Sequence, residues 1–328
     1  MTIWELDFYS RPILDENKKK VWEVLICESP TGSQGNTESL FKYAQFCSNK
    51  TVNSIWLGEA INQAIAQSNQ TPKKIRFFRR QMQNMITKAC EDNGIMAAPS
   101  RRTYALNQWL EERMQDIYPQ ETGYDVGLAQ FPSVQYPALN AVDLPDALKG
   151  DRGDQWAFVS LEAEAFGEME EWDISFGEAF PLSLVDLAPD TRIPGLIIFS
   201  PRANGLAAWM SGLELGFLEY EMGKFPRIRL ETGVSDSWIL ANVTDTKTQA
   251  EAEGFNKAKE KAKGVHFLAI QSDPESESFA GFWLMNYAKM RSWGLSNNFN
   301  LMCLQIVTIT ESSNSNSYSI SHTILVNT

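Results

Sequence analysis

Residues 4–28 of the chain read WELDFYSRPILDENKKKVWEVLICE, two apolar-rich runs joined by a polar turn. The turn holds Asn17 and three consecutive lysines, Lys18 to Lys20. Apolar runs on either side of a short polar turn predict an antiparallel β-hairpin. Asp7 lies in the middle of the first run, so the first strand is expected to carry a carboxylate.

Strands and helices alternate along the residues that follow this hairpin. The apolar spacing predicts strands over 39–47, 73–80 and 95–98, and helices over 51–68, from about 81 to 93, and over 102–116. A ribonuclease H-like domain begins with this order, β-β-β-α-β-α-β-α, and helical crossovers between strands require a mixed sheet. We therefore predict an N-terminal α/β domain over residues 1–118, of the ribonuclease H-like kind.

The second half of the chain predicts another domain of the same class. Residues 119–153 are rich in Pro, Gly and polar side chains, which is typical of a linker. Residues 154–285 contain strand-like and helical runs and predict a C-terminal α/β domain. The predicted fold class is thus α/β (α+β) with two mixed-sheet domains. Residues 286–328 include a Ser/Asn-rich stretch and predict a mobile extension.

Composition limits the functions that the chain can have. The 328 residues carry a net charge of −12, which argues against indiscriminate binding to nucleic acid but allows a local basic surface. No apolar run approaches the roughly 18 residues of a membrane span. The four cysteines, at positions 27, 47, 90 and 303, lack CxxC spacing, so no metal site or disulfide framework is indicated. We expect no cofactor and a reducing, cytoplasmic compartment.

A basic and aromatic stretch supplies the candidate RNA-binding residues. Basic side chains neutralise phosphates and aromatic rings stack on unpaired bases. In a strand, alternation places Lys74, Arg76 and Phe78 on one face and Ile75, Phe77 and Arg79 on the other, so one phenylalanine is expected in the core. The candidate set is Lys73, Lys74, Arg76, Phe78, Arg79 and Arg80, with Arg101 and Arg102 at the next strand-to-helix junction.

Five stretches, residues 4–28, 157–166, 212–221, 226–241 and 262–285, are similar to the Tab-two (Atab-two) family of oxygenic phototrophs. This resemblance implies a protein that binds the single-stranded, untranslated leader of a photosystem I reaction-centre mRNA and promotes its translation. The ribosome or photosystem assembly proteins are the further partners that it suggests. Because no transit peptide precedes the first strand, we expect a cyanobacterial-type member.

Two other classes of function compete with RNA binding. A metal-dependent nuclease of the ribonuclease H type needs several converging carboxylates, and Asp7 and Glu59 fall where two of them are expected. The third is missing, because the predicted fourth strand ends in arginines that would repel Mg²⁺. We therefore expect a scaffold that binds without catalysis. A photosystem assembly factor that contacts only proteins is the other alternative.

Overall fold

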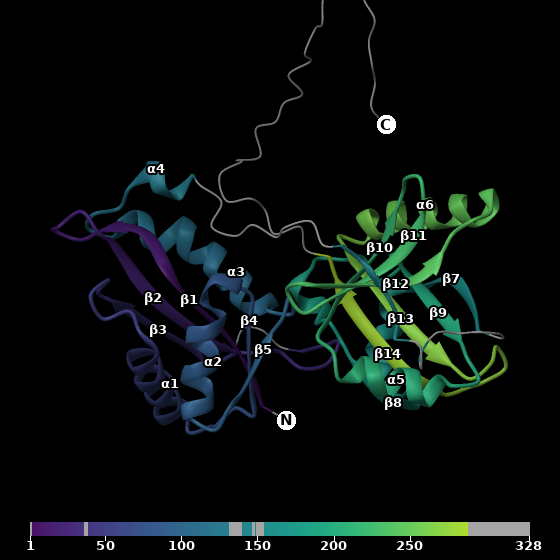
Figure 1. Cartoon of the computed structure of the whole chain (residues 1–328), viewed down its shortest axis with the longest axis horizontal. Helices are drawn as coiled ribbons and strands as arrows, with labels where there is room; N and C mark the ends of the chain where they lie inside the picture. The colour runs from purple at the N-terminus through teal and green to yellow at the C-terminus, as the bar shows by residue number, and fades with distance from the viewer. Residues whose placement is uncertain (1, 36–38, 131–139, 146–147, 149–153, 288–328) are drawn as a thin grey trace, which may run out of the picture.

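The structure, a computed structural model, describes residues 2–35, 39–130, 140–145, 148 and 154–287. Two α/β halves lie side by side, with the first residues of the chain in one half and β14 (Phe279–Asn286) in the other (Figure 1). The predicted extension over residues 286–328 falls almost entirely outside the described residues. None of the helices in the described ranges is long and apolar enough to cross a membrane.

The N-terminal half contains a five-stranded sheet of order β3-β2-β1-β4-β5. Strands β1, β2 and β3 are antiparallel, whereas β4 and β5 run parallel to β1, so the predicted hairpin and mixed sheet are confirmed. The strands are β1 (Ile3–Leu14), β2 (Lys20–Glu28), β3 (Lys42–Cys47), β4 (Lys74–Phe77) and β5 (Met96–Pro99), and the helices are α1 (Ser54–Ser68), α2 (Gln83–Asp92) and α3 (Tyr104–Glu112).

Alternation along β1 separates two cores on the two faces of this sheet. Trp4, Leu6 and Phe8 pack with side chains of α1 and α2. The residues between them, Glu5 and Asp7, therefore point to the opposite face, which α3 covers. The backbone N–H of Leu106 in α3 donates to Glu5, at 2.8 Å. The central strand of the sheet thus carries buried carboxylates on its α3 face.

The C-terminal half contains two sheets. One has the order β10-β11-β12-β6, and the other, β7-β9-β13-β14-β8, is mixed as predicted. An apolar core that includes residues of α5 and α6 lies between the two sheets. The elements are β6 (Val142–Asp143), β7 (Gln155–Glu162), β8 (Ile174–Glu178), β9 (Arg192–Phe199), α5 (Ala203–Ser211), β10 (Leu215–Glu221), β11 (Arg227–Thr232), β12 (Asp236–Asn242), α6 (Thr246–Lys261) and β13 (Val265–Gln271).

Several boundaries differ from those predicted. The predicted linker contains α4 (Val126–Ala129) and β6, and β6 pairs in parallel with β12. The predicted strand over 73–80 is only four residues long in the structure, because the chain turns into a 3₁₀ helix at Arg80. The third helix ends at Glu112 and continues as a π-helical turn over Arg113–Ile117.

Candidate functional site

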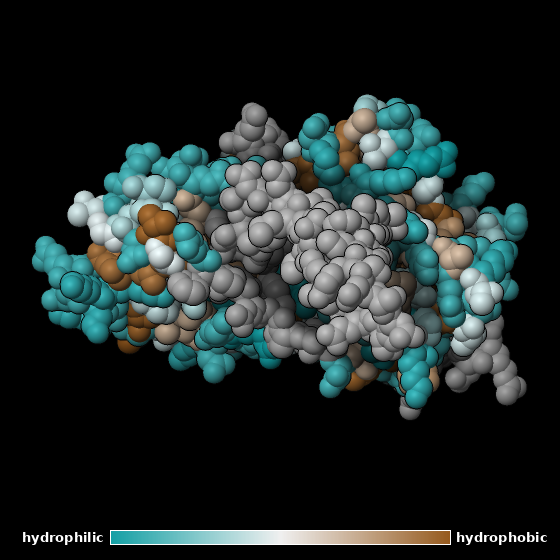
Figure 2. Space-filling model, turned by 90° about the horizontal axis from the view of Figure 1, so that it is seen from above, coloured by the Kyte–Doolittle hydropathy of each residue, from teal (hydrophilic) through white to brown (hydrophobic). Residues whose placement is uncertain are grey.

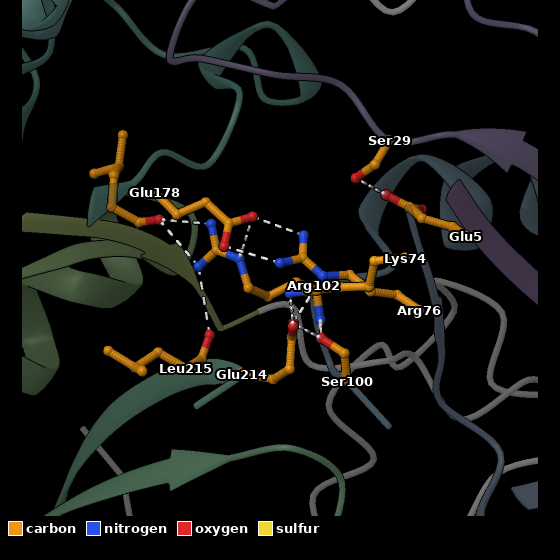
Figure 3. Close-up of polar contacts among 10 residues, drawn as sticks. Glu5, Ser29, Lys74, Arg76, Ser100, Arg102, Glu178, Glu214 and Leu215 are labelled. Carbon is orange, nitrogen blue, oxygen red and sulfur yellow. Dashed lines mark hydrogen bonds and ion pairs between the residues drawn. The ribbon is translucent and has the colours of Figure 1, made fainter. Parts of the chain in front are cut away.

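The basic face predicted for β4 exists, and it faces the C-terminal half. Phe78 packs in the core under α3, whereas Ile75 and Phe77 pack in the core under α1 and α2, so the predicted alternation holds as far as β4 extends. Both phenylalanines are buried, where only one was expected in the core. Lys74 and Arg76 project from β4 toward Glu178 and Glu214 of the C-terminal half (Figure 3).

Arg76 is at the centre of an ion-paired cluster between the two halves, which we call the interdomain cluster. Its guanidinium contacts both oxygens of Glu178, at 2.6 and 2.9 Å, and contacts Glu214 at 2.7 Å. Glu214 also accepts hydrogen bonds from Lys74, at 2.7 Å, and from the hydroxyl of Ser100, at 2.8 Å. Each of these contacts crosses from the N-terminal half to the C-terminal half (Figure 3).

Arg102 completes the interdomain cluster from the segment that leads into α3. Its guanidinium lies 3.3 Å from Glu178 and donates to the backbone carbonyls of Leu215 and Leu284, at 3.4 Å each. Arg102 is 2% exposed, so these contacts are shielded from water. A planar guanidinium that bridges a carboxylate and two carbonyls fixes the relative orientation of the groups it contacts.

Glu178 and Arg76 are both charged at neutral pH. Burial alone would raise the pKa of Glu178, but the guanidinium groups of Arg102 and Arg76 lower it to about 2. Burial likewise opposes the charge of Arg76, and Glu178 and Glu214 raise its pKa above the ordinary value. Nearby, burial raises the pKa of Glu5 to about 7, although Leu106 and Ser29 donate hydrogen bonds to its carboxylate.

A second contact joins the two halves away from the cluster. The hydroxyl of Ser33, in the connection between β2 and β3, donates to the carbonyl of Phe166 at 2.7 Å. The backbone N–H of Leu182 donates to the carbonyl of Ser33, also at 2.7 Å. Ser33 is 3% exposed, so both bonds are shielded from water. The halves are therefore held together at two separate places.

Four of the eight predicted RNA-binding side chains, Arg76, Phe78, Arg79 and Arg102, are buried, which corrects the prediction that they contact RNA directly. Arg79 pairs with Asp7 because β4 ends at Phe77 and the chain turns back toward β1. The physical reason is the same for the three arginines: carboxylates of this chain already occupy their guanidinium groups.

The other four predicted residues are accessible to different degrees. Lys74 and Arg101 are partly buried, and Arg101 lies 3.4 Å from Glu231 and over the ring of Phe217. Only Lys73 and Arg80 are exposed, just before the start of β4 and just after its end. The structure therefore divides the predicted set into six buried or partly buried residues, which pack in the core, join the two halves or neutralise Asp7, and an exposed pair that can reach a ligand.

The two carboxylates of the nuclease hypothesis lie on opposite sides of the sheet. Asp7 points to the α3 face, whereas Glu59 lies on the exposed side of α1, which packs on the other face. The carboxylate of Asp7 contacts Arg79 at 2.5 Å and Arg11 at 2.9 Å, and these arginines lower its pKa although burial would raise it. This arrangement does not bring Asp7 and Glu59 together around a metal ion.

Sequence reasoning missed Glu178 and Glu214, the carboxylates that occupy the basic face of β4. Glu178 ends β8, a strand that the apolar spacing did not predict, and Glu214 precedes β10. A negative charge at a strand end is common on protein surfaces, so neither residue carries a local signal of its partner. The one available signal was the charge balance, since buried arginines require carboxylates.

The fold and the interdomain cluster define a two-domain α/β protein whose halves form one ion-paired unit. Residues 3–113 match the family model described as RNA-binding protein Tab2/Atab2 N terminal, and residues 131–286 match the one described as RNA-binding protein Tab2/Atab2, C-terminal domain. The chain belongs to this RNA-binding protein family, as the resemblance of its sequence indicated.

Relatives in land plants are similar over most of their length. The chain is 38% identical over 289 residues to "Protein TAB2 homolog, chloroplastic" of Zea mays, in an alignment that covers 86% of this chain and 70% of the relative. It is 39% identical over 290 residues to the protein of the same name from Arabidopsis thaliana, covering 86% of this chain and 74% of that relative.

Proposed function

We propose that this protein binds the single-stranded leader of a photosystem I reaction-centre mRNA and promotes its translation without catalysing a reaction. Photosystem biogenesis would then depend on it through the supply of that reaction-centre protein. The observation that carries the proposal is that both halves match models of one RNA-binding family. The ion pairs between the halves support a single RNA-binding unit rather than two independent modules.

The arrangement of the nuclease carboxylates supports a role without catalysis. Asp7 is neutralised by two arginines and lies on the face of the sheet opposite to Glu59. A two-metal mechanism needs carboxylates that converge on one site. The ribonuclease H-like order of elements is then a scaffold for binding, as expected from the sequence.

Lys73 and Arg80 are the predicted residues that we assign to phosphate contacts, because their side chains are exposed. Lys74, Arg76, Arg101 and Arg102 would act indirectly, by holding the C-terminal half in position. The cytoplasm of a cyanobacterium, expected from the sequence, is part of this proposal, whereas both named relatives are chloroplastic.

The test is a binding titration with a photosystem I leader RNA at two salt concentrations, with Mg²⁺ present so that cleavage is also detected. Lys73→Ala/Arg80→Ala should weaken binding and reduce the slope of log affinity against log salt by about 1.4, since each phosphate contact on a single strand contributes about 0.7. Lys88→Ala/Lys247→Ala, which removes two other exposed lysines, is the matched control.

Absence of binding by the wild-type protein would refute the proposal and favour a photosystem assembly factor that contacts only proteins. Cleavage of the RNA by the wild type, abolished in Asp7→Asn, would revive the nuclease. An equal loss in the two double variants would show that Lys73 and Arg80 contribute only to the overall charge.

A further inference from the structure

The tip of the hairpin between β10 and β11, residues 222–226, has an unusual surface. It reads Met-Gly-Lys-Phe-Pro, and Met222 and Phe225 are 67% and 73% exposed. In the coloured parts of the surface seen from above, hydrophobic residues lie in small groups among hydrophilic ones (Figure 2). Among the large hydrophobic residues exposed in the described ranges, these two alone share one loop.

The two strands below the tip are firmly anchored. Tyr220 and Ile228, one on each strand, are paired across the hairpin and buried in the core of the C-terminal half. Arg227 bonds Glu221 at 2.5 Å at the last pair before the tip. Gly223 has a φ of +155°, a conformation that favours glycine, so the turn itself is specified by the sequence. The side chains of the tip therefore project from a defined backbone.

The tip combines an aromatic ring with a positive charge. The ammonium group of Lys224 lies 5.4 Å from the centroid of the Phe225 ring. Within the part of the chain that the structure describes, Lys224 forms no ion pair. Arg227 and Arg229, below the tip, are ion-paired with Glu219, Glu221 and Glu231. Lys224 therefore supplies the positive charge of the tip, although the chain as a whole carries a charge of −12. The tip thus presents an exposed aromatic ring beside one cation on an acidic protein.

This combination fits single-stranded nucleic acid better than it fits another protein. An exposed aromatic ring offers a stacking surface to any unpaired base, and a cation beside it complements the adjacent phosphate. The centres of protein–protein interfaces are instead depleted in lysine, although aromatic residues and methionine are enriched there. Ile55, equally exposed at 72%, is neither aromatic nor next to a basic residue in the sequence.

We propose that the β10–β11 hairpin tip is a base-stacking contact for single-stranded RNA, in which Phe225 stacks on an unpaired base and Lys224 pairs with a neighbouring phosphate. This inference rests on the proposed function and names a contact through which the C-terminal half takes part in it. Met222 extends the apolar side of the same contact.

The test is a fluorescence-anisotropy titration of the full chain with two labelled 20-nucleotide strands, oligouridine and an abasic strand of the same backbone. Phe225→Ala should weaken binding of oligouridine about 5- to 160-fold, the range of a single lost stacking contact, and leave binding of the abasic strand unchanged. Phe225→Trp should restore binding of oligouridine, and Lys224→Ala should weaken binding of both strands. Ile55→Ala is the control for removal of an equally exposed apolar side chain.

The outcomes separate this inference from the proposed function. If the wild type binds oligouridine and Phe225→Ala binds it equally well, the stacking contact is refuted while RNA binding stands. If the wild type binds neither strand, the proposed function fails as well. An equal loss in Ile55→Ala, or an equal loss on the abasic strand, would also overturn the assignment of Phe225 as a stacking residue. The circular dichroism melting curves of all variants should superimpose on that of the wild type.

Discussion

Replacement of Arg76 by Met should weaken the attachment of the two halves more than any substitution of a surface charge. The side chain of Arg76 is only 3% exposed and makes three contacts of 2.6 to 2.9 Å with Glu178 and Glu214. Removal of one partner from a buried ion pair costs about 3–5 kcal/mol, because the charge left behind is uncompensated.

Two features of the interdomain cluster reduce that cost. The side chain of Glu178 is 37% exposed, so water can solvate its carboxylate once Arg76 is gone. Glu214 is 12% exposed and keeps its contact with Lys74. We therefore expect Arg76→Met to lower the free energy of unfolding by about 2–3 kcal/mol, below the range for fully buried pairs.

Urea unfolding followed by tryptophan fluorescence measures this effect, since both halves contain tryptophans. Lys88→Met is the control, because its pair with Asp92 is exposed to solvent on both sides and should contribute nothing measurable. A curve for Arg76→Met that superimposes on that of Lys88→Met would refute the role assigned to the interdomain cluster.

Three further substitutions test the buried charges. Burial raises the pKa of Glu5 from 4.5 to about 7, so the unfolded chain releases this proton at a lower pH than the folded one. As the pH rises from 4.5 to 7, the free energy of unfolding of the wild type should therefore fall by about 3 kcal/mol relative to that of Glu5→Gln. Parallel plots of unfolding free energy against pH for the two proteins would contradict this. Burial lowers the pKa of Lys259 from 10.5 to about 8, so the folded chain loses this proton at a lower pH than the unfolded one. The free energy of unfolding should therefore rise by about 3 kcal/mol between pH 8 and 10.5, and urea titrations of Lys259→Met should not show this rise. Asp7→Asn removes the carboxylate that Arg79 and Arg11 share, so the free energy of unfolding should fall by about 3–5 kcal/mol in the same assay. The RNA affinity of the folded variant should equal that of the wild type.

Local patterns in the sequence predicted most of the N-terminal sheet. The hairpin of residues 4–28, helix α1 and the crossovers through α2 are encoded by neighbouring residues, so periodicity and turn composition were sufficient. In the C-terminal half, β14 was not predicted, although its residues are apolar. A strand buried on both faces lacks the alternation that distinguishes strand from helix, and residues 279–285 are of this kind.

The candidate site could not be predicted from local patterns. A run of basic residues around two phenylalanines has the same appearance whether it binds RNA or a carboxylate of the same protein. The difference depends on Glu178 and Glu214, which lie 102 and 140 residues away from the residues that they bind. The absence of a third nuclease carboxylate was visible in the sequence, but the pairing of Arg79 with Asp7 depended on where β4 ends.

The interdomain cluster has a consequence for the synthesis of the chain and for experiments that truncate it. Arg76 and Arg102 are synthesised well before Glu178 and Glu214, so a nascent N-terminal half exposes guanidinium groups whose partners have not yet been translated. A fragment that ends near residue 113 would present the same groups permanently and attract any polyanion, ribosomal RNA included. Nucleic acid binding by such a fragment would report on an unfinished interface, so mapping by truncation would assign the activity to residues that the intact protein keeps buried.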